Sequence, residues 1–155
     1  MKKIILAIIA VMVPLMLSAG STDFWFRHFS VEDGLSSSAV RAIMQDKYGF
    51  MWLGTDDGLN RYDGTTIKIY RLNPEGINDY ISFLYDTADR IWIGTGDGVY
   101  IYDYETENFE PFKLLTAKGD SIKTNVNHIA EDRDGNLWFS TVGQGIFKYN
   151  VSKHY

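Results

Sequence analysis

DKYGFMWLGTDDGLNRYD, at residues 46–63, decides the fold because the chain repeats it twice more. It aligns without a gap with DTADRIWIGTGDGVYIYD (86–103), and after one inserted residue with DRDGNLWFSTVGQGIFKYN (132–150). The shared tryptophans lie 40 and then 46 residues apart, at Trp52, Trp92 and Trp138. A repeat of this period indicates a solenoid, a propeller or a similar array.

Each repeat is rich in aromatic and β-branched residues separated by glycine-containing turns, which predicts strands joined by short turns. We expect strands at 40–46, 50–55, 58–63 and 66–71, at 80–86, 90–95, 98–103 and 107–112, and at 125–132, 136–141 and 145–149. Four antiparallel strands per repeat make a propeller blade. The predicted fold is therefore all-β, a β-propeller of about 2.7 blades at 40–71, 80–112 and 125–150.

The second strand of each blade is apolar on both sides, as in FMWLGT and RIWIGT, which is typical of a strand buried on both faces. We therefore place the three tryptophans between blades, rather than on the surface as platforms for sugar rings. Gly54 and Gly94, with Ser140 in the third copy, are expected where a neighbouring blade approaches closely.

The N-terminal region precedes the repeats. Residues 1–20 combine MKK, a short apolar run and small residues, which predicts a secretory signal peptide. The remaining 21–155 would then be the partial propeller in the periplasm, and FWFRHFS (24–30) a strand that closes the ring by pairing with the last blade. A net charge of −5 argues against nucleic acid as a partner. The chain has no cysteine, so packing alone must hold the fold.

Each copy begins with an aspartate six residues before its tryptophan, at Asp46, Asp86 and Asp132. These aspartates could hold a metal, but the following glycines come too early for a calcium loop. We interpret them as hairpin turns in which the carboxylate accepts backbone N–H groups. The left-handed position of each turn is expected at Gly49, Asp89 and Gly135. No metal and no cofactor is predicted.

The sequence resembles the two-component regulator propeller repeat. The resemblance rests on Asp33-Gly34-Leu35-Ser36, on the spacing Gln45-Asp46-x-x-Gly49-x-x-Trp52, and on Gly54-Thr55, Gly58-Leu59 and Tyr62-Asp63-Gly64. It covers nearly all of 24–150. The family implies a periplasmic sensor with seven-bladed propellers, a membrane anchor and a histidine kinase, commonly responding to oligosaccharides. With fewer than three blades, we expect this chain to be an N-terminal fragment of such a sensor, without the rest of the propeller and the kinase.

Two sets of connections should share one face of the propeller. They are the links between blades, at 31–39, 72–79 and 113–124, and the turns TDDG (55–58), TGDG (95–98) and TVGQG (141–145). Loops on a rigid scaffold often carry binding residues. The candidates for ligand binding are Asp56, Asp57, Asp97 and Gln144, although aspartate and glycine are also ordinary turn formers.

The function expected is carbohydrate sensing without catalysis. The three histidines have no partners at catalytic or metal-binding spacing, so no catalytic residue is predicted. A secreted propeller enzyme, such as a lyase or glycosidase, and a bare interaction scaffold remain as alternatives. Because fewer than three blades leave blade faces and an edge strand open, we expect the isolated chain to self-associate.

Overall fold

The computed structural model describes residues 24–72, 79–87, 89–113 and 121–150. The expected signal peptide at 1–20 lies outside these residues. The described part contains three antiparallel sheets and one short 3₁₀ helix, η1 (Val31–Asp33). Ser30 caps η1, since its hydroxyl accepts the backbone N–H of Glu32.

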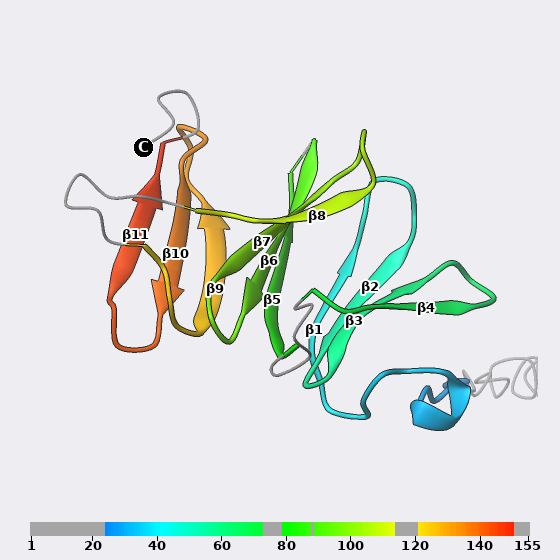
Figure 1. Cartoon of the computed structure of the whole chain (residues 1–155). Coiled ribbons are helices and arrows are strands. Elements are labelled where there is room, and N and C mark those ends of the chain that lie inside the picture. The colour runs from blue at the N-terminus through cyan, green and yellow to red at the C-terminus, as the bar shows by residue number, and fades with distance from the viewer. Residues whose placement is uncertain (1–23, 73–78, 88, 114–120, 151–155) are drawn as a thin grey trace, which may run out of the picture.

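The three sheets are the predicted blades, and each is a meander in which successive strands pair (Figure 1). The first blade contains β1 (Val40–Gln45), β2 (Met51–Thr55), β3 (Gly58–Tyr62) and β4 (Ile67–Tyr70). The second contains β5 (Ile81–Asp86), β6 (Arg90–Thr95), β7 (Val99–Asp103) and β8 (Asn108–Pro111). The third contains β9 (Val126–Glu131), β10 (Leu137–Thr141) and β11 (Ile146–Tyr149). The prediction of antiparallel, four-stranded propeller blades with an incomplete third blade is confirmed.

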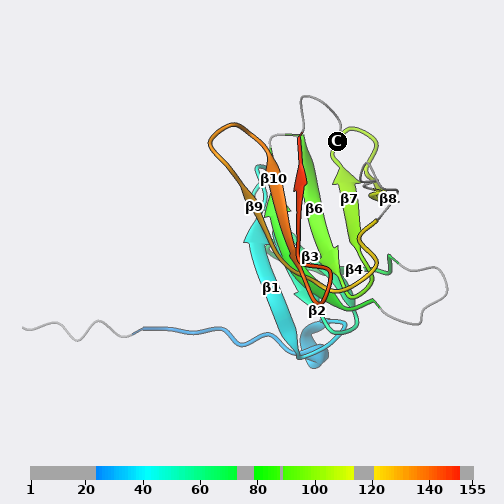
Figure 2. The same cartoon turned by 90° about the vertical axis from the view of Figure 1, so that its left-hand side faces the viewer.

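The blades stand side by side, with blade 2 between blades 1 and 3 (Figures 1 and 2). Strand pairing assigns each side chain to one of two faces. We call the face that carries the repeated tryptophan the tryptophan face, and the opposite one the aliphatic face. In both seams the tryptophan face of one blade packs on the aliphatic face of the next.

The seam between blades 1 and 2 is centred on Trp52, which is fully buried. Its ring lies 5.1 Å from that of Tyr102 on the aliphatic face of blade 2. Leu84, Ile91 and Ile93 complete the same cluster. Each such buried side chain contributes about 1.5–3 kcal/mol of transfer free energy, so the seam accounts for much of the stability.

The seam between blades 2 and 3 repeats this arrangement with Trp92 against Phe139 and Leu137. Trp138 differs from the expectation of a buried blade tryptophan, because its side chain is 39% exposed. It occupies the tryptophan face of blade 3, and no described residues form a blade on that side. Burial of the repeated tryptophan therefore requires the next blade as well as its own.

Glycine permits the close approach of blades. A Cβ added at Gly54 would lie 2.6 Å from Ile81 Cγ2, and one added at Gly94 would lie 3.2 Å from Val126 Cβ. Ile81 and Val126 begin equivalent strands and pair with Thr95 and Thr141. The first seam therefore excludes any side chain at position 54, while the second leaves slightly more room.

The aspartate turns of copies one and three have the same geometry. Asp46 accepts the backbone N–H groups of Tyr48 and Phe50 at 2.9 Å and the indole N–H of Trp52 at 2.7 Å. Asp132 likewise accepts from the backbone N–H of Asn136 and, at 2.9 Å, from the indole N–H of Trp138. Gly49 and Gly135 take the left-handed conformation, with φ of 89° and 79°. One carboxylate thus joins the turn to the blade tryptophan.

The second copy departs from the predicted alignment. Asp86 pairs with Ile91 in the strand ladder, as Gln45 pairs with Met51, so Asp86 is equivalent to Gln45. Thr87 occupies the position of Asp46. The turn that follows is one residue shorter, and the Thr87 N–H donates to the carbonyl oxygen of Arg90 at 2.9 Å.

The expected roles of Asp86 and Asp89 are therefore wrong. Asp86 accepts the hydroxyl of Tyr104 at 2.9 Å, and the buried indole N–H of Trp92 has no acceptor among the described residues. Asp89 does not adopt a positive φ, so it does not take the left-handed position. The ungapped alignment concealed this deletion, since both aspartates lie six residues before a tryptophan.

Residues 24–30 were expected to form a closing strand, but no strand is present there. Phe29 contacts Tyr62 edge-on at 5.1 Å, while Phe24, Trp25 and Phe26 are exposed. The strand was expected to pair with a last blade, and the described residues offer it no such partner. Without inter-strand hydrogen bonds, an extended segment does not become a strand.

Candidate ligand site

The links and turns predicted to share a face do so, and we call this edge of the blades the rim. The turn after β2, β6 and β10 is tied each time to the preceding link by one backbone hydrogen bond. Asp56 N–H donates to Ala39 O at 3.1 Å, Gly96 N–H to Tyr80 O at 3.1 Å, and Val142 N–H to Asn125 O at 2.9 Å. The rim is therefore a repeated, rigid platform.

Asp56 and Asp57 lie on this rim but are engaged by arginines. Asp56 accepts two hydrogen bonds from Arg41, at 2.7 and 3.0 Å. Asp57 accepts from Arg71 at 2.5 and 2.9 Å. The hydrogen bond from Arg41 lowers the pKa of Asp56, which keeps this carboxylate charged. Both aspartates fasten the turn to its neighbours, so a ligand would have to compete with two bidentate pairs.

Gln144 is engaged as well. Its side-chain oxygen accepts the backbone N–H of Lys123 at 3.0 Å, and its amide N–H donates to Ser121 O at 3.3 Å. It satisfies the backbone of the link between blades 2 and 3. Gln144 is exposed, and both ends of its amide are used to support that link.

Asp97 is the candidate that borders a cavity. Its carboxylate accepts the hydroxyl of Thr95 at 2.8 Å, and no salt bridge involves it among the described residues. The cavity measures about 310 Å³ and lies between the β6–β7 turn, the end of β8 and the following link. This volume is at the lower end of the range for small-molecule sites.

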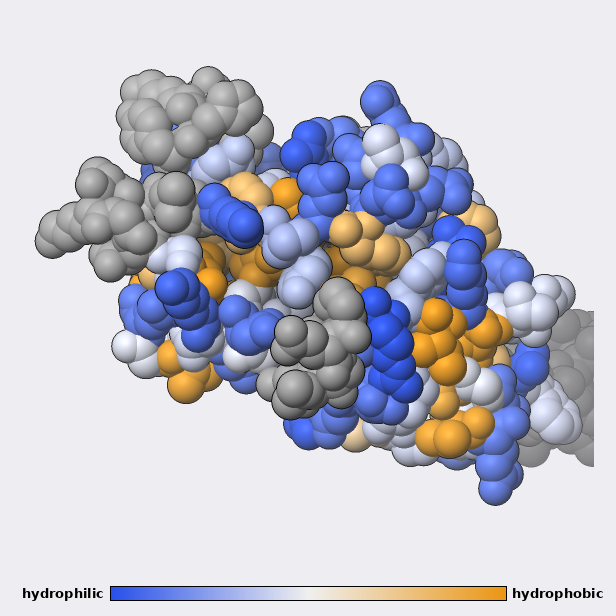
Figure 3. Space-filling view, viewed as in Figure 1, coloured by the Kyte–Doolittle hydropathy of each residue, from blue (hydrophilic) through white to orange (hydrophobic). Residues whose placement is uncertain are grey.

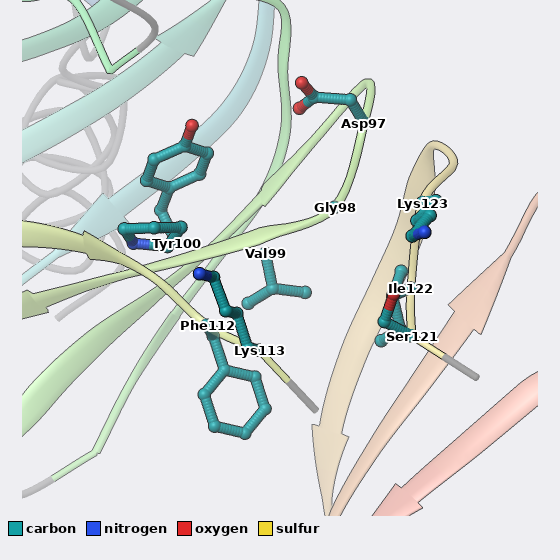
Figure 4. Close-up of a pocket in the computed structure, with 10 residues that line it drawn as sticks. Asp97, Gly98, Val99, Tyr100, Phe112, Lys113, Ser121, Ile122 and Lys123 are labelled. Carbon is teal, nitrogen blue, oxygen red and sulfur yellow. The ribbon is translucent and has the colours of Figure 1, made fainter. Parts of the chain in front are cut away.

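The cavity brings together polar groups from three segments. Figure 4 shows Asp97 and Lys113 on the side of blade 2, and the link that carries Ser121 and Lys123 across from them, while the ring of Tyr100 points away from that link. Val99, Phe112 and Ile122 supply apolar lining. Sequence reasoning missed Lys113, Ser121 and Lys123, because strand and link residues meet here only after the seam forms. The one available signal was the length of the 113–124 link.

The electrostatics of this cavity are mixed. Lys113 and Lys123 line the cavity, and neither forms a salt bridge with another described residue. The pKa of Tyr100 is raised, first by burial and then by the charges of Asp97 and Asp79. Tyr100 therefore remains neutral, and its ring packs in the seam with blade 1 on the other face of the sheet from Val99.

Among the described residues, no group of three histidine, aspartate or glutamate side chains could hold a metal ion. The described segments also contain no helix with the length and apolarity of a membrane span. The aspartate turns use their carboxylates on backbone and indole N–H groups, which accounts for them without a metal.

Comparison with known proteins identifies the repeats. The family model of the two component regulator propeller matches residues 34–57 and 121–143. Histidine kinase P4 of Formosa agariphila is 56% identical over 59 residues, which are 38% of this chain and 4% of the kinase.

Solved structures show the same relationship. The extracellular domain assigned to the hybrid two component system BT3049 of B. thetaiotaomicron has a TM-score of 0.73 and 30% identity, over 83% of this chain and 19% of that one. The corresponding domain of BT4673 has a TM-score of 0.64 and 22% identity, over 89% and 20%, which is a likeness of fold. The chain thus spans about a fifth of the length of these solved relatives.

Proposed function

The chain belongs to the two-component regulator propeller repeat family, and we propose that it forms part of a periplasmic ligand-binding sensor whose ligand is an oligosaccharide. The likeness to an extracellular domain of a hybrid two component system at 30% identity supports the sensor part. Transfer of the signal would belong to the longer protein, since this chain matches about a fifth of that domain.

The rim cavity supports the choice of ligand. Sugars present many hydroxyl groups, which need paired donors and acceptors, together with an apolar ring face. Asp97 supplies an acceptor, Lys113 and Lys123 supply donors, and Val99, Phe112 and Ile122 supply the apolar surface. An open site of this kind suits one or two terminal sugar units.

Binding without turnover follows from the same residues. Hydrolysis of a glycosidic bond ordinarily uses a pair of carboxyl groups that flank the bond. The cavity lining includes one carboxylate, Asp97. The site is therefore suited to recognition, and the kinase reaction of relatives would lie elsewhere in a longer protein.

Titration calorimetry with a panel of neutral and acidic oligosaccharides tests this proposal on the mature chain, residues 21–155. Saturable binding is expected, and it should weaken at least about tenfold in Asp97→Asn. Asp57→Asn is the matched control, because Asp57 lies on the same rim outside the cavity. Equal loss in the control, or product formation from any sugar, would contradict the proposal.

A further inference from the structure

The lining of the rim cavity carries charges of both signs, with lysine in excess. Lys113 and Lys123 are its basic residues and Asp97 is its acidic residue, which leaves a balance of one positive charge. The whole chain, in contrast, carries a net charge of −5. A positive cavity on an acidic protein concentrates anionic groups at that cavity, because the surrounding surface repels them.

The two lysines differ in this respect from the arginines of the rim. Arg41 and Arg71 are each held by an aspartate of the β2–β3 turn, at 2.7 and 2.5 Å. Among the described residues, no carboxylate forms such a pair with Lys113 or Lys123. An anionic ligand at the cavity therefore replaces no ion pair of this part of the chain.

The lysines stand on two walls whose backbone is fixed. Lys113 follows β8, where the N–H of Phe112 donates to the carbonyl oxygen of Val99 at 2.8 Å. Lys123 lies on the link, and its backbone N–H donates to Gln144 Oε1 at 3.0 Å. Figure 4 shows the two walls across from each other. Because hydrogen bonds hold both walls, binding has to order little more than the lysine side chains.

Asp97 fixes the orientation of a charged ligand. It lies on the β6–β7 turn, where its carboxylate accepts the hydroxyl of Thr95 at 2.8 Å. Figure 4 shows this carboxylate apart from the side chain of Lys113. A ligand anion beside Asp97 would meet a like charge, whereas a ligand hydroxyl can donate to it. The anionic group is therefore expected at the lysines, with hydroxyl groups toward Asp97.

A second cavity has a different character. It measures about 180 Å³, lies on blade 1, and is lined by Tyr62 and apolar side chains without a charged residue. Figure 3 shows hydrophobic surface over the blade 1 end of the molecule. Of these two cavities, the rim cavity is the one that combines apolar lining with a few charged groups, as a polar, charged ligand requires.

We propose that the ligand of the rim cavity is an acidic oligosaccharide, with Lys113 and Lys123 binding its carboxylate or sulfate group and Asp97 accepting a hydroxyl. This assignment rests on the proposed function, which makes the ligand a sugar. Lysine binds anions as a point charge rather than through a planar fork, so a uronate carboxylate and a sulfate ester both fit. Val99 and Ile122 supply apolar surface for the sugar ring.

Titration calorimetry of the mature chain, residues 21–155, with matched pairs of oligosaccharides tests this preference. One set of pairs differs by a glucuronate in place of a glucose unit, and the other by a sulfate ester in place of a free hydroxyl. We expect the acidic member to bind at least about tenfold more tightly than the neutral one. This advantage should shrink in about 1 M sodium chloride, because salt screens exposed charges.

Lysine variants locate the effect. Lys113→Gln and Lys123→Gln should each weaken binding of the acidic member about threefold or more, and together about tenfold or more. Binding of the neutral member should not change, since glutamine still donates a hydrogen bond to a hydroxyl. Lys113→Arg and Lys123→Arg keep the charge and should keep the preference. Lys68→Gln is the matched control, because it removes the same charge from an exposed position of β4 in blade 1.

The outcomes separate the charge preference from the sugar itself. Equal affinity for acidic and neutral members, or an equal loss in Lys68→Gln, overturns the preference for acidic ligands, while saturable binding of the neutral members still supports the proposed function. Inorganic sulfate is the probe for the anion alone. If it binds as tightly as the sulfated sugars, the sugar contributes nothing and both proposals fail. Both also fail if no member of any pair binds saturably.

Discussion

At the scale of single residues, one carboxylate organises a blade turn. Asp46 accepts two backbone N–H groups and the indole N–H of Trp52, and it is itself buried. The tryptophan can therefore enter a dry seam without an unsatisfied polar group. In the second copy, Trp92 lacks this acceptor because the turn is one residue shorter.

Replacing Asp46 with alanine should lower the free energy of unfolding by about 2–3 kcal/mol, because the buried indole N–H and two backbone N–H groups lose their acceptor. The free energy of unfolding from urea titration measures the loss. Asp134→Ala is the control, since Asp134 is exposed in the corresponding turn of the third copy and should change stability by less than about 0.5 kcal/mol. Equal stability of Asp46→Ala and the wild type would show that the carboxylate does not support Trp52.

Asp86 gives a prediction about pH. Its pKa is raised, first by burial and also by the charge of Asp46, while the hydrogen bond from Tyr104 opposes the shift. A raised folded-state pKa means that the folded protein binds the proton more tightly than the unfolded chain. Its contribution to stability is full below the unfolded pKa of about 3.9 and is lost as pH rises through the folded value.

Asp86→Asn should therefore stabilise the protein at pH 7, because the amide removes a half-buried charge and can still accept from Tyr104. The advantage should disappear near pH 3, where Asp86 is neutral in both states. Urea midpoints at several pH values measure this difference. If Asp86→Asn is more stable than the wild type by the same amount at pH 3, the charge of Asp86 is not the cause of the difference.

At the scale of the blade, spacing between sheets depends on the absence of a Cβ at one position of the second strand. Gly54 and Gly94 stand at the two seams, and Ser140 faces outward on blade 3. The clearances differ, with 2.6 Å at the first seam and 3.2 Å at the second. Identical motif positions therefore tolerate substitution to different degrees.

Gly54→Ala should cost about 1–3 kcal/mol, because the new methyl group meets the Cβ and Cγ2 of Ile81, which are fixed close to the backbone. Gly94→Ala should cost less, since its neighbours have to yield by only a few tenths of an ångström. Ser140→Ala, which adds no atom, is the control. Thermal unfolding ranks the three, and a larger loss at Gly94 than at Gly54 would contradict the packing described here.

At the scale of the whole molecule, the described part is a row of three blades held by two apolar seams, with a face open at each end. The melting temperature should therefore rise with protein concentration, because association through the open faces stabilises only the folded chain. Scanning calorimetry across a hundredfold concentration range measures this effect. Ile43 of blade 1 and Ile146 of blade 3 are exposed on these two faces, so Ile43→Asp and Ile146→Asp should make the melting temperature less dependent on protein concentration.

The sequence by itself determined the strand positions within the blades and the rim, because the repeat spacing and the turn residues act locally and each blade is a meander of neighbouring strands. It did not determine the state of residues 24–30, which form no strand. The tertiary structure decided the rest. It placed Asp56, Asp57 and Gln144 in contacts with Arg41, Arg71 and the 121–124 link, and left Asp97 at a cavity.

Only packing between blades could decide these points, because the cavity combines β7 and the end of β8 of blade 2 with residues 121–123 of the link to blade 3. The same reason explains Trp138. Its motif is that of Trp52, yet one is exposed and the other buried, since burial depends on whether another blade lies beside it. The sequence specifies each blade, and the seams between blades specify which residues remain free to bind.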